Sequence, residues 1–186
     1  MSINKIVRFI FYLLKRVFNA LSAFRSELLK PIAYIKGEDF ENCLRRTVFT
    51  KDNFDLVMKT HDFHENNKDY IESSLYPDFL FRDKKTNTEF FVEAKYREHL
   101  FKGKVYWCRE YQFRRYHKLT KDVPVIIAIG LGGRPDNPNH IFLVPLEKIE
   151  YIGLYPTFLA EYEFHDDRKN LMDGLMDSVY DLSTGR

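Results

Sequence analysis

A lone carboxylate and a Glu-x-Lys pair in the middle of the chain have the spacing that a metal-dependent hydrolytic site requires. Asp78 lies in an expected strand over 76–82, and Glu93 and Lys95 lie two apart in the next, over 89–96. Side chains two apart in a strand project from the same face. If a short turn joins the strands as a hairpin, Asp78 and Glu93 come to adjacent positions, where paired carboxylates bind a hard divalent ion such as Mg²⁺. Lys95 would then hold the attacking water or neutralise charge in the transition state.

Each of these short patterns also has a simpler interpretation. Pro77-Asp78 is a common way to enter a strand from a turn, and Glu93-x-Lys95 is a common surface ion pair. What favours chemistry is the combination of these residues with the elements that surround them.

Those elements read as a layered α/β domain. A helical pattern opens at Gly37 and places Glu41 at the edge of its apolar face, from which it could reach the same metal ion or its waters; Glu38 would replace it if the helix were turned. The remaining pattern predicts strands and a helix in the order strand 53–60, strand 76–82, strand 89–96, helix 109–121, strand 123–130 and strand 141–146.

With these elements in order, the sequence resembles the PD-(D/E)xK nuclease superfamily, which has the restriction-endonuclease-like fold. The matching residues are Pro77-Asp78, then Glu93-Ala94-Lys95, with Glu41 in the preceding helix. A further match, Gln112-x-x-x-Tyr116, resembles the QxxxY element of RecB-type nuclease domains. The resemblance covers roughly residues 37–146.

The resemblance implies an αβββαβ core with a mixed central sheet flanked by helices. It also implies that Asp78 and Glu93 hold Mg²⁺, with Mn²⁺ as the alternative ion, and that the Ala94 carbonyl is a third ligand. Lys95 would be the catalytic lysine and Glu41 an additional carboxylate at the metal. Gln112 is expected to belong to the catalytic site. The implied activity is that of a Mg²⁺-dependent deoxyribonuclease, and the alternative is an inactive nuclease-fold module that binds nucleic acid and is tethered to a membrane or an assembly.

The net charge of +2 conceals a strongly basic stretch next to an acidic one. Residues 82–121 carry twelve basic and five acidic side chains, whereas residues 37–81 carry five and ten. A polyanion-cleaving enzyme needs this combination, although solvated faces that differ in sign would give the same counts. DNA is the expected partner, with RNA left open, and the residues expected to contact it are Arg114, Arg115, Tyr116 and Lys118.

The first 36 residues form a separate basic segment. Apolar residues recur at helical spacing from Ile3 to Leu28, and Arg8, Lys15 and Arg16 interrupt the apolar runs too often for a transmembrane span or a signal peptide. Two interpretations stay open for residues 1–30. The helix packs on the domain or a protein partner, or it lies in an anionic membrane surface.

Composition places the chain among ordinary globular proteins. With 186 residues, 45% hydrophobic and 30% charged, we expect three parts: a helical extension over 1–36, a nuclease-like domain over 37–150, and a C-terminal extension over 151–186 that ends in an amphipathic helix. Two cysteines exclude a disulfide framework and favour a reducing cytoplasm, with the inner face of a membrane as the alternative location. A homodimer is a further open expectation.

Overall fold

The computed structural model describes residues 3–28, 31–60, 76–120 and 122–165 of the chain. The chain divides into two compact units, Met1–Ile35 and Lys36–Arg186. Helix α1 (Ile3–Leu28) occupies most of the first unit and has the bounds that the apolar periodicity predicts. No helix in the described part of the chain is long and apolar enough to cross a bilayer. The expected C-terminal helix lies outside the described residues.

The second unit is built on a five-stranded mixed sheet with the strand order β1-β2-β3-β5-β6. β3 and β5 are parallel, joined by a crossover through α4 (Glu110–Leu119), and the other neighbouring pairs are antiparallel. The strands are β1 (Phe54–Lys59), β2 (Phe79–Asp83), β3 (Glu89–Arg97), β5 (Val125–Arg134) and β6 (Asn137–Pro145). The predicted αβββαβ order and mixed central sheet are confirmed.

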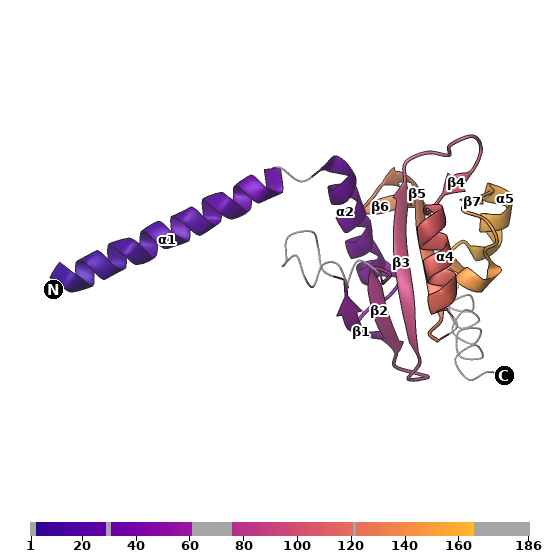
Figure 1. Cartoon of the computed structure of the whole chain (residues 1–186), viewed down its shortest axis with the longest axis horizontal. Coiled ribbons are helices and arrows are strands. Elements are labelled where there is room, and N and C mark those ends of the chain that lie inside the picture. Colours follow the sequence, from indigo (N-terminus) through magenta and orange to yellow (C-terminus); the bar gives the residue numbers. More distant parts are fainter. Residues whose placement is uncertain (1–2, 29–30, 61–75, 121, 166–186) are drawn as a thin grey trace. The chain divides into compact units, whose positions relative to one another are not determined.

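Two helices cover opposite faces of this sheet (Figure 1). α2 (Ile32–Thr47) packs Phe40 and Leu44 into one aromatic-rich core, and α4 packs Tyr116 into the other. α2 packs so closely on the sheet that a Cβ on Gly130 of β5 would lie 2.5 Å from the Phe40 ring. Glycine at this position therefore allows the turn of α2 that carries Phe40 and Glu41 to approach the sheet this closely.

A polar turn joins β2 to β3, as expected. The buried Asp83 carboxylate accepts hydrogen bonds from the Thr86 backbone N–H (2.9 Å) and hydroxyl (2.6 Å). Asn87 has a φ of 59°, a left-handed conformation that asparagine tolerates well. The turn therefore fixes the register of the hairpin without a glycine.

The structure differs from the sequence-based expectation at three places. α2 begins at Ile32 rather than Gly37. Residues 131–140, expected to be a loop, extend β5 and β6, because the left-handed Gly132 and Gly133 are accommodated within the hairpin. Short elements were also missed because too few residues show any periodicity: β4 (Val105–Tyr106) pairs with β7 (Gly153–Leu154), and the short helices are η1 (Leu146–Lys148), α5 (Pro156–Leu159) and η2 (Ala160–Tyr162).

Residues 151–165 pack within the second unit. Leu154 and Leu159 are buried in the core on the α4 side, and the Phe164 N–H donates to the Ile141 carbonyl at 2.7 Å. This part of the expected C-terminal extension therefore shares the core of the sheet.

Candidate active site

The site lies where β2 and β3 part. Their antiparallel pairing runs until Phe79 faces Val92, so Asp78, the next residue, lies opposite Glu93. β3 continues to Arg97 beside β5. The two carboxylates are therefore adjacent, as the sequence predicts. They lie at the end of the β2–β3 pairing, beyond which the backbone of β3 no longer bonds to β2.

Main-chain groups on both sides hold Asp78. Its Oδ2 accepts a hydrogen bond from the Ala94 N–H at 2.7 Å, and its carbonyl accepts from the Thr60 N–H and hydroxyl, each at 3.0 Å. The N–H and C=O of one strand residue point to the same side, so the Ala94 carbonyl also faces the edge where Asp78 lies. This carbonyl is thus available as the third oxygen that the family resemblance implies.

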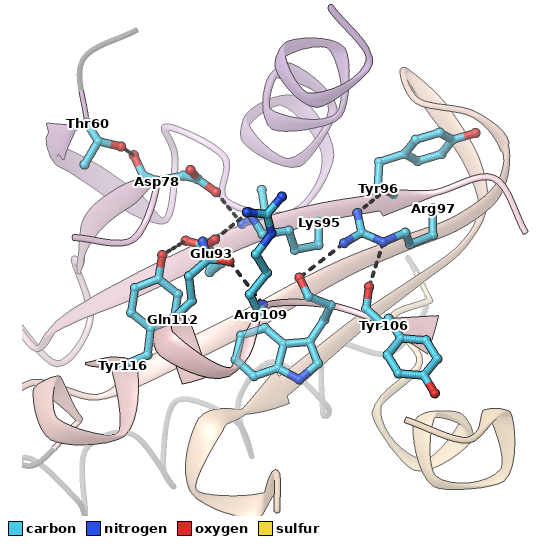
Figure 2. A network of polar contacts seen from close by, with 12 residues as sticks. Thr60, Asp78, Glu93, Lys95, Tyr96, Arg97, Tyr106, Arg109, Gln112 and Tyr116 are labelled. Atoms are coloured by element: carbon cyan, nitrogen blue, oxygen red, sulfur yellow. Dashed lines mark hydrogen bonds and ion pairs between the residues drawn. The ribbon is translucent and has the colours of Figure 1, made fainter. Parts of the chain in front are cut away.

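Glu93 is almost fully buried, with 1% of its surface exposed, and both its oxygens have partners. Oε1 pairs with the Lys95 ammonium at 2.5 Å, and Oε2 accepts a hydrogen bond from the Tyr116 hydroxyl at 2.8 Å. Figure 2 shows the polar side chains that meet here, those of Asp78, Glu93, Lys95 and Tyr116. Three elements, β2, β3 and α4, therefore contribute to one site.

The electrostatics of this group show an excess of negative charge. Burial, followed by the charges of Glu93 and Glu41, raises the pKa of Asp78 to about 8, although Lys95 and the Ala94 N–H act in the opposite direction. Lys95 beside Glu93 and Lys59 beside Glu41 compensate only two of the three carboxylates. A hard divalent cation, which prefers carboxylate and carbonyl oxygens, fits this donor set and would supply the missing charge.

Lys95 and Tyr116 keep their protons in this environment. Burial would lower the pKa of Lys95, but the charges of Glu93 and Asp78 outweigh it and raise that pKa. Burial and the Glu93 charge also raise the pKa of Tyr116. Lys95 is therefore a cation rather than a general base, and Tyr116 is a neutral hydrogen-bond donor.

Glu41 is close enough to the site to act on the charge of Asp78, and it also pairs with a lysine of β1. Its Oε2 forms an ion pair with Lys59 of β1 at 3.1 Å. Among the residues that the structure describes, no three His, Cys, Asp or Glu side chains gather around one point as a metal-binding group. Direct metal ligation by Glu41 therefore stays a prediction. Lys59 was missed, because nothing in its own strand pattern indicates that it faces the α2 helix.

The two residues of the QxxxY element differ in their contacts. Gln112 Oε1 accepts a hydrogen bond from the Arg109 backbone N–H at 3.2 Å, so its side chain satisfies a free donor at the start of α4 rather than reaching the carboxylates. Tyr116 is only 2% exposed. It cannot contact nucleic acid from that position, and it orients Glu93 instead.

The remaining predicted nucleic-acid contacts lie on α4. Arg114 and Lys118, one helical turn apart, are exposed, whereas the Arg115 guanidinium lies 5.1 Å from the centre of the Tyr116 ring. A surface depression of about 520 Å³ is lined by Glu110, Tyr111, Arg114, Arg115 and Lys118. Two of the three predicted cations are therefore free to face a ligand, and Arg115 is partly committed to packing.

Comparison with known proteins gives likenesses among solved structures only. No family model and no curated protein matches the chain. Among solved structures, Hjc of Archaeoglobus fulgidus, a Holliday junction resolvase from an archaeal hyperthermophile, is similar with a TM-score of 0.48 and 14% sequence identity, over 67% of this chain and 93% of that chain. The element order and the mixed sheet in this chain's own structure are those of the restriction-endonuclease-like fold that its sequence motifs imply.

Proposed function

We propose that the chain is a metal-dependent nuclease that hydrolyses phosphodiester bonds of DNA. The observation that carries this proposal is the position of Asp78 opposite Glu93 at the parting of two strands, with the Lys95 ammonium bonded to Glu93. Excess negative charge beside a fixed cation suits a reaction in which a metal ion and a lysine share the phosphate charge.

Asp78, Glu93 and the Ala94 carbonyl would hold Mg²⁺, or Mn²⁺, and Glu41 would hold a water of that ion. When bound, the ion would act as a Lewis acid on the phosphate and lower the pKa of a bound water. Glu41 suits the outer position because its carboxylate already pairs with Lys59, 3.1 Å away. Outer partners of this kind orient a metal site without adding a ligand.

Lys95 would act as a fixed positive charge. Its raised pKa keeps it protonated at neutral pH, and its ion pair with Glu93 fixes its position. It would hold the attacking water by hydrogen bonding and neutralise charge on the phosphate oxygens in the transition state. Substrate phosphates would be held by Arg114 and Lys118 on the exposed side of α4.

The test is cleavage of plasmid and linear DNA by the full chain with Mg²⁺, Mn²⁺ or EDTA. We expect cutting with either ion, none in EDTA, and none by Asp78→Ala. An exposed carboxylate of β1, Asp55, gives a matched control, and Asp55→Ala should cut normally. Binding without cutting under every condition would favour the inactive binding module, and cutting of RNA in preference to DNA would correct the substrate.

The Tyr116 hydroxyl supports a first prediction. In Tyr116→Phe, one oxygen of the buried Glu93 loses its 2.8 Å hydrogen bond, while the ring that packs beside Trp107 remains. Removing an outer partner of a metal ligand lowers metal affinity or activity by roughly 10- to 100-fold. We expect the Mg²⁺ concentration for half-maximal cutting to rise within this range. An unchanged Mg²⁺ dependence would show that Tyr116 has only a packing role.

We further propose that α1 attaches the chain to an anionic membrane surface. Residues 8–22 are all exposed, and at about 100° per residue their apolar members fill an arc of roughly 200°. The opposite face carries Arg8, Lys15 and Arg16 and no acidic residue. A wide apolar face beside a polar face whose charges over residues 8–22 are all positive matches the acyl boundary and the anionic headgroups of a bilayer.

This attachment predicts flotation with vesicles. The full chain should float with vesicles that contain anionic lipid and remain at the bottom with neutral ones, because the cations add headgroup attraction to apolar burial. Leu14→Glu, which places a charge in the apolar face, should abolish flotation, whereas Asn19→Gln on the polar face should not. Equal behaviour of both variants would exclude the membrane and leave a protein partner as the occupant.

A further inference from the structure

A short, well-built hairpin follows the strand that carries Glu93 and Lys95. Phe101 and Lys104 exchange two backbone hydrogen bonds, of 2.9 and 3.1 Å, across a two-residue turn. The turn residues Lys102 and Gly103 have positive φ values of 50° and 73°, the pattern of a tight hairpin turn. A loop with defined backbone geometry thus presents Phe101 directly before its turn.

Arg97 ties the base of this hairpin to β3. Its guanidinium donates hydrogen bonds to three carbonyls, those of Tyr96 (2.8 Å), Tyr106 (2.7 Å) and Trp107 (3.3 Å). Figure 2 shows these bonds beside Lys95 on the same strand. Arg97 therefore serves the architecture, although its sequence position in the basic stretch would suit a phosphate contact.

Trp107 anchors the far end of the hairpin. It is fully buried, and its backbone N–H and indole Nε1 donate to the carbonyls of Ile152 and Tyr151, each at 3.2 Å. The β4–β7 pairing lies directly beside these bonds. The hairpin and the segment 151–155 are therefore held together as one surface.

This surface exposes three aromatic side chains. Phe101 is 63%, Tyr151 69% and Tyr155 55% exposed. Phe101 meets the ring of Tyr106 edge-on at 5.9 Å, and Tyr106 shares a depression of about 560 Å³ with both exposed tyrosines. We call Phe101, Tyr151 and Tyr155 the aromatic patch.

Two lysines lie against the aromatic patch. The Lys102 ammonium is 5.5 Å from the Phe101 ring centre, and the Lys104 ammonium is 4.4 Å from that of Tyr155. Rings that remain more than half exposed beside cations are the combination that binds single-stranded nucleic acid, because bases stack on the rings while the cations attract phosphates. Bases in an intact duplex do not offer their faces in this way.

The distance from the cutting centre is limited by the chain itself. Phe101 follows Lys95 by six residues, so the two are at most about 20 Å apart even when fully extended. Successive phosphates of one strand rise by about 3.4 Å, and 20 Å corresponds to about six nucleotides.

We propose that the aromatic patch stacks on unpaired nucleobases, so that the enzyme selects DNA with unpaired bases within about six nucleotides of the scissile phosphate. This inference rests on the proposed nuclease function and adds its substrate class. It places recognition in side chains that the cutting chemistry does not use.

The test compares a duplex with a forked DNA of the same sequence. Cleavage by the full chain should favour the fork, and Phe101→Ala and Tyr155→Ala should reduce that preference by about tenfold, since stacking contributes about 1–3 kcal/mol per base. Cutting of the duplex should not change. Leu56→Ala, an exposed apolar side chain on β1, is the control and should retain the preference.

A binding measurement separates stacking on an aromatic ring from simple contact with an apolar side chain at position 101. The Lys95→Met variant, which is expected to cut slowly, serves as the background for a forked DNA with 2-aminopurine in its unpaired arm. Binding of this variant should quench the fluorescence of the base. The double variant with Phe101→Trp should still quench it, whereas the double variant with Phe101→Leu should not. Cutting of both DNAs at equal rates by the wild type, or equal loss on both by Phe101→Ala, would overturn the inference while leaving the nuclease function intact. Absence of any cutting by the wild type would instead overturn the nuclease function.

Discussion

Lys95→Met is expected to lower the rate of DNA cleavage by about 10²- to 10³-fold at saturating Mg²⁺, the usual effect of removing one group that stabilises transition-state charge. Lys95 is protonated, bonded to Glu93 at 2.5 Å and 22% exposed, so its ammonium can face both the carboxylate and a substrate. Methionine keeps the length and removes the charge. Gel quantification of nicked plasmid over time measures the effect, and DNA affinity should change little.

The same substitution leaves a buried carboxylate with fewer partners. Breaking a buried ion pair by removing one member costs about 3–5 kcal/mol, although here the Tyr116 hydroxyl still donates to Glu93. Thermal unfolding with Mg²⁺ present must therefore accompany the rate measurement. Lys148→Met, at an exposed lysine of η1, is the matched control and should cut normally. A folded Lys95→Met variant that cuts at the wild-type rate would remove Lys95 from the chemistry.

The metal-free protein should become less stable as the pH rises from about 4 to about 8. The pKa of Asp78 is about 8 in the folded chain and near 3.8 in the unfolded one. Between these values the folded state binds more protons than the unfolded state, so the free energy of unfolding falls, at most by about 1.4 kcal/mol per pH unit. Above pH 8 this group contributes no further change. The raised pKa of Lys95 acts only above about 10.5 and does not affect this window.

Urea unfolding in EDTA across this pH range measures the effect. Asp78→Asn should flatten the pH dependence and be more stable than the wild type at pH 8 in EDTA, because a neutral amide can still accept from the Ala94 N–H. Mg²⁺ should stabilise the wild type more at pH 8 than at pH 6, since protons compete less for Asp78 at the higher pH. A flat wild-type profile in EDTA, together with destabilisation by Asp78→Asn at pH 8, would contradict the proposed origin of the shift.

Sequence patterns predicted the features that depend on residues close together in the chain, such as helix bounds and turns. The apolar periodicity predicts α1 to its observed bounds, and the polar turn before Glu89 predicts the hairpin that places Asp78 opposite Glu93. Contacts between elements distant in the sequence were not predictable. The pairing of Glu41 with Lys59 depends on the depth at which α2 sits.

The position of Tyr116 has the same origin. A Gln-x-x-x-Tyr spacing indicates that the two residues share a face of α4. That Tyr116 reaches Glu93 depends on how α4 packs on the sheet between the parallel strands β3 and β5. Three main-chain carbonyls around Arg97 give no sequence signal at all, because acceptors of this kind belong to the backbone and not to any residue type.

The bonds of Arg97 also bear on the timescale of recognition. The hairpin at 101–104 follows the strand of Lys95 closely, and the Arg97 hydrogen bonds join that strand to Tyr106 and Trp107 beyond the hairpin. Loop motions occur within nanoseconds to microseconds, whereas lids and domains close within microseconds to milliseconds. If the aromatic patch acts as proposed, discrimination between substrates occurs in the first encounter and shows itself in dissociation rates, with no slow isomerisation before the cut.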